Sequence, residues 1–420
     1  MGRLPCHTTG MKKSKPHPTR SKFTILRQLC NLIPPHLVPM LARETGVEDR
    51  SRTFSPWAHV VALMHAQLAH SIGLNDVCDS LRLNSGPLSA IRGAVPPSRN
   101  NFSHANRERP AEMAEKLFWA TLEHLQNIHP KFSGGRSGRG FLRRFHRTVH
   151  AVDSTTIQLV ASCMDWARHR RRKAAAKCHT RLNLQSFLPS FAIVDTARHH
   201  DSKRAREVCA GISRGEIVVF DKAYMDFEHL KDLDDRGVSW VSRAKENLAA
   251  TVDTRFPVDK DSRILRDDVV TLDHGSDRHP EFVRRVVALV EVDGKEREMT
   301  FLTNHLKWSP QTVADLYGAR WEIEVFFKQL KQTLQLADFL GHNANAVRWQ
   351  VWIALLVYLL LRFQAFLTQW NHSFTRLFTL TRASLWKKLD LFSLLRSYGT
   401  AGGRWRMLAT PHQAYLPGFG

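Results

Sequence analysis

The sequence predicts an α/β fold that is interrupted by a β-rich insertion and preceded by an all-α region. Helical patterns fill residues 21–130 almost throughout, with apolar residues three and four positions apart. Strand and helix patterns then alternate from residue 145. Between residues 245 and 303 strand-like runs dominate, and two long helical patterns follow them. Alternating strands and helices are typical of an α/β domain, and a separate group of strands within them indicates an insertion.

The charge of the chain points to nucleic acid as a partner. Its 420 residues include 61 Lys and Arg against 39 Asp and Glu, a net charge of +22, and such an excess favours polyanions. A membrane surface is the competing partner. However, the apolar run at residues 351–361 is shorter than the roughly 20 residues of a membrane-spanning helix. We therefore expect a buried core helix there and no membrane partner.

The patterns divide the chain into five segments. The first residues are polar and basic and have no apolar stretch of the kind found in secretory signals, so we expect a disordered arm and a cytoplasmic protein. The glycine-rich run 133–140 indicates a linker. The predicted segments are the arm at 1–20, a helical domain expected to bind DNA at 21–130, a linker at 131–144, an α/β core at 145–372 and a basic tail at 373–420.

Two short helices are candidates for reading double-stranded DNA. They are expected at residues 74–83 and 98–109, and the second is rich in Ser, Arg, Asn and His. Such a pair suggests a helix-turn-helix-like reader. The alternative is a small helical bundle that makes no groove contacts. The candidates for base contacts are Arg99, Asn100, Asn101 and His104.

Two acidic residues follow predicted strands. Asp153 follows 149–152 and Asp221 follows 216–220, so we expect each at the exposed end of an apolar strand. Neighbouring strands would bring the carboxylates side by side, where like charges repel unless a cation lies between them. Carboxylates are ligands of Mg²⁺, and two such ions can promote a phosphodiester displacement. The alternative is that each Asp caps a turn.

A third acid, Glu324, lies on a polar stripe of one predicted helix over residues 317–335. At 100° per residue, a wide apolar arc forms the opposite side of this helix. Glu324 is therefore a candidate metal ligand, placed among cations that would hold an anion. The alternative is a solvated face with an Arg320–Glu324 ion pair at four-residue spacing. The other members of the stripe are Tyr317, Arg320, Lys328, Lys331 and Gln335.

At these residues the chain resembles bacterial insertion-sequence transposases of the DDE class, in the IS-four-type family. The resemblance extends over about residues 22–350. Its most specific part is the signature Y-x2-R-x3-E-x6-K, which is matched by Tyr317, Arg320, Glu324 and Lys331. In one departure, Lys222 and Ala223 stand where relatives often have Arg-Gly. Further similar pieces are 52–57, 98–109, 151–157 with Trp166, Lys177 and His179, 215–230 with Tyr224, 302–304 and 339–341.

The resemblance implies an RNase H-like catalytic core with its β-rich insertion at about 245–303. It implies that Asp153, Asp221 and Glu324 bind two Mg²⁺ ions, with Mn²⁺ able to substitute. These metals would first activate water to nick a transposon end. They would then promote the attack of the freed 3′-OH on target DNA. A homodimer on DNA is expected because two ends must be brought together.

The same resemblance gives roles to the residues around Glu324. Arg320 and Lys331 would hold phosphates next to the scissile bond, and Lys328 would contact DNA beside them. Tyr317 would position the strand.

Two weaker features complete the set. The basic run at 168–177 includes Arg171 and Arg172, which we expect to contact the DNA backbone, and the alternative is a solvated face. Trp240 and Trp308 could stack on an unpaired base, although a core position is the preferred interpretation of each.

These features predict a DNA transposase that binds the terminal inverted repeats of its insertion sequence, cleaves the ends and joins them to target DNA. The alternative is an inactive or recruited transposase that acts as a sequence-specific DNA-binding protein. A general nuclease of the same fold is less favoured because the helical front region suggests a choice of site.

Overall fold

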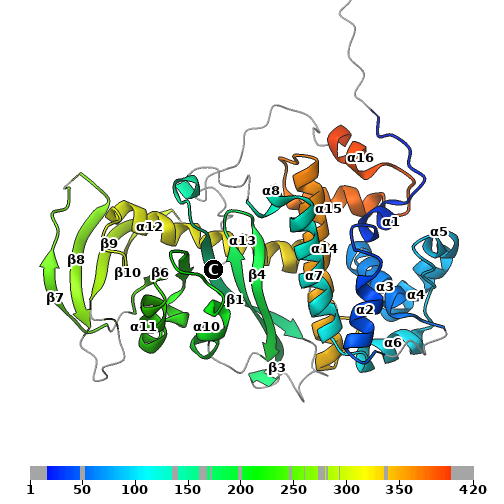
Figure 1. Ribbon diagram of the computed structural model, residues 1–420, viewed down its shortest axis with the longest axis horizontal. Helices are drawn as coiled ribbons and strands as arrows, with labels where there is room; N and C mark the ends of the chain where they lie inside the picture. The colour runs from blue at the N-terminus through cyan, green and yellow to red at the C-terminus, as the bar shows by residue number, and fades with distance from the viewer. Residues whose placement is uncertain are drawn as a thin grey trace, which may run out of the picture.

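The computed structural model describes residues 17–47, 53–134, 141–159, 168–170, 173–196, 201–245, 248–259, 261–272, 280, 282–292, 294–334 and 339–398. A large sheet and its helices lie beside a separate group of helices (Figure 1). The sheet occupies the left and centre of this view and the helical group occupies the right. The prediction of a mixed α/β chain is therefore confirmed.

Helices from both ends of the chain form the helical group. Several begin at residues that cap them: the side chains of Thr24, Ser55 and Ser98 each accept a hydrogen bond from the main-chain N–H three residues ahead, which satisfies a donor that has no partner inside the helix. The described helices of the group are α1 (Ile25–Cys30), α2 (Leu37–Glu44), α3 (Pro56–Ala69), α4 (Leu74–Leu83), α5 (Ser85–Ser89), α6 (Arg99–Glu108), α7 (Glu112–Ile128), α8 (Pro130–Ser133), α14 (Ala344–Leu367), α15 (Phe374–Ala383) and α16 (Leu391–Tyr398).

The strands form one ten-stranded sheet. They are β1 (Val149–Leu159), β2 (Arg168–Arg170), β3 (Lys173–Asn183), β4 (Leu188–Thr196), β5 (Ile217–Phe220), β6 (Ser239–Arg243), β7 (Ala250–Arg255), β8 (Ile264–Leu272), β9 (Val283–Val292) and β10 (Lys295–Thr303). Their order is β2-β3-β1-β5-β6-β10-β9-β8-β7, with β4 also paired to β3.

The sheet has a mixed centre and an antiparallel extension. Strand β3 is antiparallel to both of its partners β1 and β4, whereas β5 is parallel to both β1 and β6. The strands of the predicted β-rich insertion, β7 to β10, continue the same sheet because β10 pairs with β6. The insertion region therefore shares its hydrogen-bonded framework with the strands that carry the acids.

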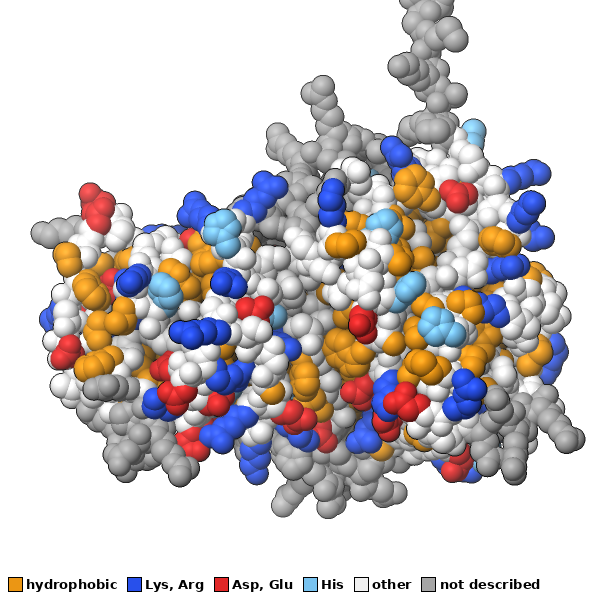
Figure 2. All heavy atoms as spheres, viewed as in Figure 1, with side chains coloured by type: hydrophobic (Ala, Val, Ile, Leu, Met, Phe, Trp, Pro, Cys, Tyr) orange, Lys and Arg blue, Asp and Glu red, His pale blue; other side chains and the backbone are white. Residues whose placement is uncertain are grey.

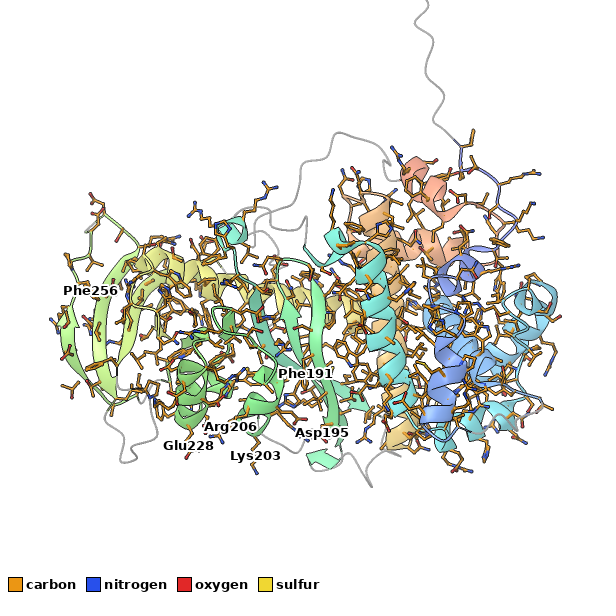
Figure 3. The ribbon with its side chains drawn as sticks, in the orientation of Figure 1. Phe191, Asp195, Lys203, Arg206, Glu228 and Phe256 are labelled. Atoms are coloured by element: carbon orange, nitrogen blue, oxygen red, sulfur yellow. The ribbon has the colours of Figure 1, made fainter. Side chains whose placement is uncertain are left out.

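One face of the sheet is covered by α10 (Asp201–Cys209) and α11 (Phe227–Asp235). Val208 of α10 and Leu230 of α11 are buried in the same cluster as Val152 of β1 and Phe220 of β5. At the outer side of this layer, an ion pair of 2.7 Å between Arg206 and Glu228 joins the two helices (Figure 3).

The other face is covered by α12 (Pro310–Ala319) and α13 (Trp321–Lys328), which continues into the π-helical turn η4 (Gln329–Thr333). Ala151 and Val219 alternate with the residues of the first face and are buried together with Leu316 and Ile323. This face therefore brings the signature residues of α12 and α13 onto the strands that carry Asp153 and Asp221.

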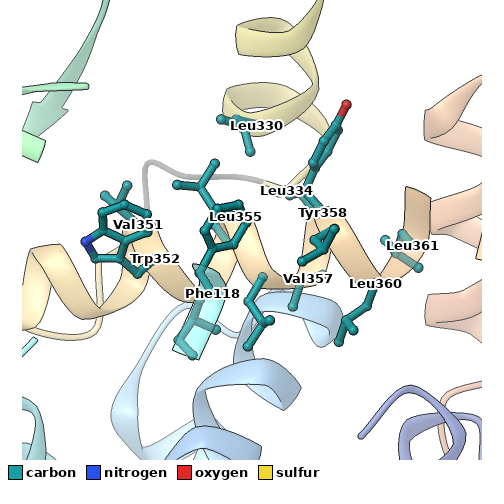
Figure 4. Close-up of a cluster of buried hydrophobic side chains, with 14 of the residues drawn as sticks. Phe118, Leu330, Leu334, Val351, Trp352, Leu355, Val357, Tyr358, Leu360 and Leu361 are labelled. Carbon is teal, nitrogen blue, oxygen red and sulfur yellow. The ribbon is translucent and has the colours of Figure 1, made fainter. Parts of the chain in front are cut away.

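The apolar helix α14 is the centre of the helical group. It contacts α3, α6 and α7, and also β4 of the sheet. By length and composition alone α14 could cross a membrane, but 78% of its most apolar window is buried inside the fold. Figure 4 shows Phe118 of α7 among side chains that α14 contributes to this buried cluster. The prediction of a buried core helix at 351–361 is confirmed.

The described part of the predicted tail packs on the first helices. Between α15 and α16, the carbonyl of Lys388 accepts a hydrogen bond of 3.1 Å from the N–H of Ser21. The side chain of Gln28 donates to the carbonyl of Leu389 at 2.7 Å and accepts from the N–H of Leu391 at 2.9 Å. Contacts between the two ends of the chain therefore complete the helical group.

Both helices of the predicted DNA reader form, as α4 and α6. The connection between them contains α5 and buries Leu88 and Ile91. The connection is longer than the three- or four-residue turn of a helix-turn-helix motif. Its two buried apolar side chains pack it against the core.

Gly341 lies just before α14 and has no room for a side chain. A Cβ atom built on it would lie 2.5 Å from Cβ of Ala346, and an Ala side chain cannot rotate away. We expect Gly341→Ala to lower the free energy of unfolding by about 1–3 kcal/mol, because the backbone must shift to relieve the clash. Denaturant titration measures this change.

Gly86→Ala is the matched control. Gly86 is exposed on α5, and nothing lies within 4 Å of a Cβ built there. Its substitution should leave the stability unchanged or raise it by up to about 1 kcal/mol. Equal effects of the two substitutions would contradict the close packing at Gly341.

Candidate active site

The segment predicted as one helix over 317–335 is divided in the structure. At the junction of α12 and α13, the N–H of Arg320 bonds to the carbonyl of Tyr317 at 3.1 Å, and the N–H of Ile323 bonds to the carbonyl of Arg320 at 3.0 Å. This three-residue spacing is that of a 3₁₀ turn. The single-helix prediction is therefore wrong, because a tight turn follows α12 and a wide π turn follows α13. Gln335 lies outside the described residues.

The end of β5 brings the two strand acids together. Val152 of β1 pairs with Phe220 of β5 in parallel register, so the next residues are Asp153, still on β1, and Asp221, just beyond β5. Asp221 directly follows β5, as predicted. Asp153 does not end its strand, because β1 continues to Leu159 as the antiparallel partner of β3. The strand-end prediction is wrong for Asp153, which lies in mid-strand where β5 stops.

Arg320 connects Asp153 to the acid on α13. Its Nη1 atom lies 2.5 Å from Oδ2 of Asp153 and 3.5 Å from Oε1 of Glu324. The side chains of Arg320 and Asp153 are only 12% and 15% exposed, whereas that of Glu324 is 40% exposed. A buried charge without a partner is strongly unfavourable. The ion pair with Glu324 that was considered as an alternative is thus present, and it is part of a larger cluster.

Tyr317 connects α12 to the second strand acid. Its hydroxyl donates a hydrogen bond of 3.2 Å to Oδ1 of Asp221. Its ring lies 4.9 Å from that of Phe301, and the guanidinium of Arg320 lies 5.5 Å from its centroid. Burial raises the pKa of Tyr317 to about 12, so the hydroxyl keeps its proton and remains a donor.

The electrostatics of the cluster favour an added positive charge. Burial raises the pKa of Asp153 to about 7, while the charge of Arg320 lowers this pKa and the charge of Glu324 raises it. The N–H of Ser154 donates a hydrogen bond of 2.7 Å to Oδ1 of Asp153 and favours the ionised form. Two carboxylates therefore share one guanidinium, and a further cation would lower the pKa of Asp153.

The donor chemistry here suits a hard divalent cation, because carboxylate oxygens are preferred by Mg²⁺ and Mn²⁺. Asp153 and Glu324 fit as a pair that already faces one cationic group. Across the described ranges, no group of three or more His, Cys, Asp or Glu side chains is close enough to hold a metal ion. Asp221 is instead engaged by the hydroxyl of Tyr317.

A buried hydrogen bond near Asp221 was not predicted. Nδ1 of His179 on β3 lies 2.9 Å from the hydroxyl of Tyr224, and both side chains are buried. The N–H of Tyr224 also bonds to the carbonyl of Asp221 at 2.9 Å. The turn that carries Asp221 is thereby joined to β3 across β1. Both residues lie in the sequence blocks that resemble transposases, but their spacing along the chain gives no sign of this contact.

The other candidate residues lie elsewhere or outside the described residues. Lys328 on α13 and Lys331 on η4 are exposed. The candidates on α6 are also exposed, and α6 lies in the helical group, away from α13 and β1 (Figure 1). These α6 residues are Arg99, Asn100, Asn101 and His104. Arg171 and Arg172 lie outside the described residues.

The basic run and the tryptophans have mixed outcomes. Part of the run at 168–177 belongs to the sheet, because β3 begins at Lys173. Trp240 is fully buried and donates a hydrogen bond of 2.8 Å to Asp234, which confirms the core interpretation. The ring of Trp308 is stacked on His305 with centroids 3.8 Å apart.

Comparison with known proteins gives a family match that includes all of these acids. The Transposase DDE domain matches residues 144–360, and a domain of unknown function matches residues 21–91. A Sinorhizobium fredii protein described as a transposase is 28% identical over 321 residues, which cover 76% of this chain and 85% of that protein. The transposase described for insertion sequence element IS5377 of Geobacillus stearothermophilus is 27% identical over 364 residues, which cover 81% and 85%.

Among solved structures, the piggyBac transposase synaptic complex with hairpin DNA covers 88% of this chain and 83% of its own. The two chains are 9% identical and the TM-score is 0.44, which is too low to establish a common fold.

Arg320→Gln should destabilise the protein in a pH-dependent way. Removing the guanidinium leaves the buried Asp153 without its partner, which should lower the free energy of unfolding at pH 8 by about 3 kcal/mol. The pKa of Asp153 in the fold, about 7, is above that of an unfolded chain. Its contribution to stability is therefore present at low pH and lost as the pH rises through 7. Denaturant titration of Arg320→Gln at pH 5 and pH 8 should show the smaller loss at pH 5.

An exposed ion pair provides the control for this substitution. Arg263 lies 2.6 Å from Glu296, and these side chains are 52% and 59% exposed. Arg263→Gln should cost less than about 1 kcal/mol at either pH, because solvent screens such pairs. A loss at Arg320 as small as that at Arg263 would contradict the buried cluster.

Proposed function

We propose a reaction for this chain on the premise that it belongs to the DDE transposase family, as the match over residues 144–360 of its 420 residues establishes. In this proposal the protein binds the terminal inverted repeats of its own insertion sequence. It cleaves the phosphodiester bonds at the ends and joins the freed 3′-OH groups to target DNA. The observation that carries the proposal is the convergence of Asp153, Arg320 and Glu324, with Tyr317 on the neighbouring Asp221.

Asp153, Asp221 and Glu324 would hold two Mg²⁺ ions, and Mn²⁺ could replace them. DDE transposases generally use divalent metal ions, which supply the activation of an attacking oxygen and the stabilisation of a leaving oxygen. The raised pKa of Asp153 supports this assignment, because a carboxylate in a buried site with another acid nearby favours a cation.

The cationic side chains have separate tasks in this proposal. Arg320 offsets the charge of the acids and would bind a phosphate beside them, since its guanidinium can donate several hydrogen bonds in one plane. Lys328 and Lys331 are exposed along α13 and η4 and would bind neighbouring phosphates. Tyr317 keeps its proton and would orient the strand from the side of Asp221.

The strand order supports an RNase H-like core. Three antiparallel strands in the order β4-β3-β1 are followed by the parallel strands β5 and β6. The first acid lies on the central strand of this set and the second follows its parallel neighbour. In this proposal β7 to β10 are the insertion within residues 245–303, the core spans 145–372, and the linker at 131–144 separates it from the helical DNA-binding domain.

DNA recognition is assigned to the helical group and to the basic surface. Figure 2 shows Lys and Arg side chains spread over the visible face of both the sheet region and the helical group. Arg99, Asn100 and His104 are exposed together on α6 and would contact base edges in double-stranded DNA. A homodimer would hold two ends at once, and the reaction would take place on DNA in the bacterial cytoplasm.

The decisive test is cleavage of a labelled duplex that carries the end of the element. Glu324→Gln removes a ligand charge and nearly keeps the shape of the side chain. We expect it to abolish Mg²⁺-dependent cleavage, with a loss of at least about 10³-fold, while binding of the duplex persists. EDTA should have the same effect on the wild-type protein.

Glu322→Gln is the matched control on the same helix. Glu322 is two residues from Glu324 and interacts with Arg362 rather than with Asp153, so cleavage should continue at nearly the wild-type rate. Equal losses in both variants would point to a general defect of α13. Binding without cleavage by the wild-type protein would instead favour a recruited transposase that acts as a DNA-binding protein.

A further inference from the structure

The helix that carries Glu324 ends in a turn of unusual width. In η4 the N–H of Leu334 bonds to the carbonyl of Gln329 at 3.1 Å, which is five-residue spacing. Such π turns are rare and occur frequently at functional sites. Lys331, a member of the transposase signature, lies inside this turn.

Gln67 of α3 and His70, the residue that follows this helix, contact the end of this turn. Nε2 of Gln67 donates a hydrogen bond to the carbonyl of Leu334, and Nε2 of His70 lies 2.9 Å from the carbonyl of Thr333. The last carbonyl groups of a helix have no partner within it. Gln67 and His70, from another part of the chain, therefore cap the helix that carries Glu324 and continues into η4.

The position of His70 is fixed by further contacts. Nη1 of Arg382 on α15 lies 2.8 Å from Nδ1 of His70. A guanidinium can only donate, so Nδ1 of His70 is the acceptor. Nε2 therefore carries the proton and donates a hydrogen bond to the carbonyl of Thr333. The imidazole is also stacked on Phe378 with ring centroids 4.7 Å apart. His70 therefore joins α3, η4 and α15.

The π turn affects where Lys331 lies relative to Glu324. A π turn closes over one more residue than an α-helical turn, so Lys331 is rotated away from the position that a continuous α-helix would give it. The apolar neighbours Leu330 and Leu334 are buried, and Lys331 is exposed. Figure 4 shows these two leucines beside α14. The turn is therefore packed through its leucines and capped at its last carbonyl groups.

We propose that Gln67 and His70 are positioning residues that hold the π turn and thereby set the place of Lys331 relative to Glu324. The inference rests on the proposed function, in which Lys331 binds a phosphate near the scissile bond. It adds a physical link between the helical group, which is assigned the reading of DNA, and the helix that carries the third acid.

The test compares His70→Phe with the wild-type protein. Phe can keep the stacking on Phe378 but loses both ring nitrogens. We expect the rate of single-turnover cleavage of the duplex end to fall about 10-fold, with an unchanged dissociation constant for that duplex. Gln67→Ala is the second variant, because it removes the other cap without affecting the left-handed backbone at His70, where φ is 57°. His36→Phe is the control, since His36 is exposed on the helical group.

A double substitution separates positioning from a general loss of stability. Residues that act through one another give non-additive effects. If His70 acts through Lys331, His70→Phe should slow cleavage in the wild-type background but not in a Lys331→Ala background. Equal slowing in both backgrounds, or no slowing by His70→Phe in the wild-type background, would overturn the proposal.

Hydrogen exchange provides a readout that is independent of DNA and of cleavage. Amide exchange in a peptide that covers residues 325–334 should become at least several-fold faster in His70→Phe, with no change in His36→Phe. Unchanged exchange would show that the cap does not hold the turn. Absence of cleavage by the wild-type protein would contradict the proposed function itself, so the two failures are distinguishable.

Discussion

The guanidinium of Arg320, held between the carboxylates of Asp153 and Glu324, is the interaction on which the rest of the candidate site depends. A buried acid on a strand and an acid on a helix can face each other with both carboxylates ionised only if a positive charge accompanies them. The sheet supplies one carboxylate and the face covered by α12 and α13 supplies the other. The cluster therefore contains a counter-charge for its own acids.

The helical group also contacts the helix that carries Glu324. The helix with Glu324 is packed through η4 against α14, and α14 lies among helices from both ends of the chain. Hydrogen bonds from α3 reach the end of η4. The arrangement of the candidate site therefore depends on contacts between residues that are hundreds of positions apart in sequence.

The sequence named the residues of the candidate site, whereas several of their contacts could not be predicted from it. Asp153, Asp221 and Glu324 were identified because acids after apolar strands and a signature spacing are local patterns. The mid-strand position of Asp153 was missed because the acid was taken to end the apolar run 149–152, whereas β1 continues past the end of β5 as the partner of β3. The break at Arg320 was missed because its backbone angles remain helical. The contact of His179 with Tyr224 crosses a strand and leaves no trace in residue spacing.

Mapping of metal-dependent backbone cutting tests most directly whether the three acids hold metal ions at one place. Carboxylate sites for Mg²⁺ also bind Fe²⁺, which with ascorbate and peroxide generates radicals that cut the nearby main chain. We predict cuts close to Asp153, Asp221 and Glu324 that excess Mg²⁺ suppresses. Cuts confined to other segments, or cuts that Mg²⁺ does not suppress, would contradict it.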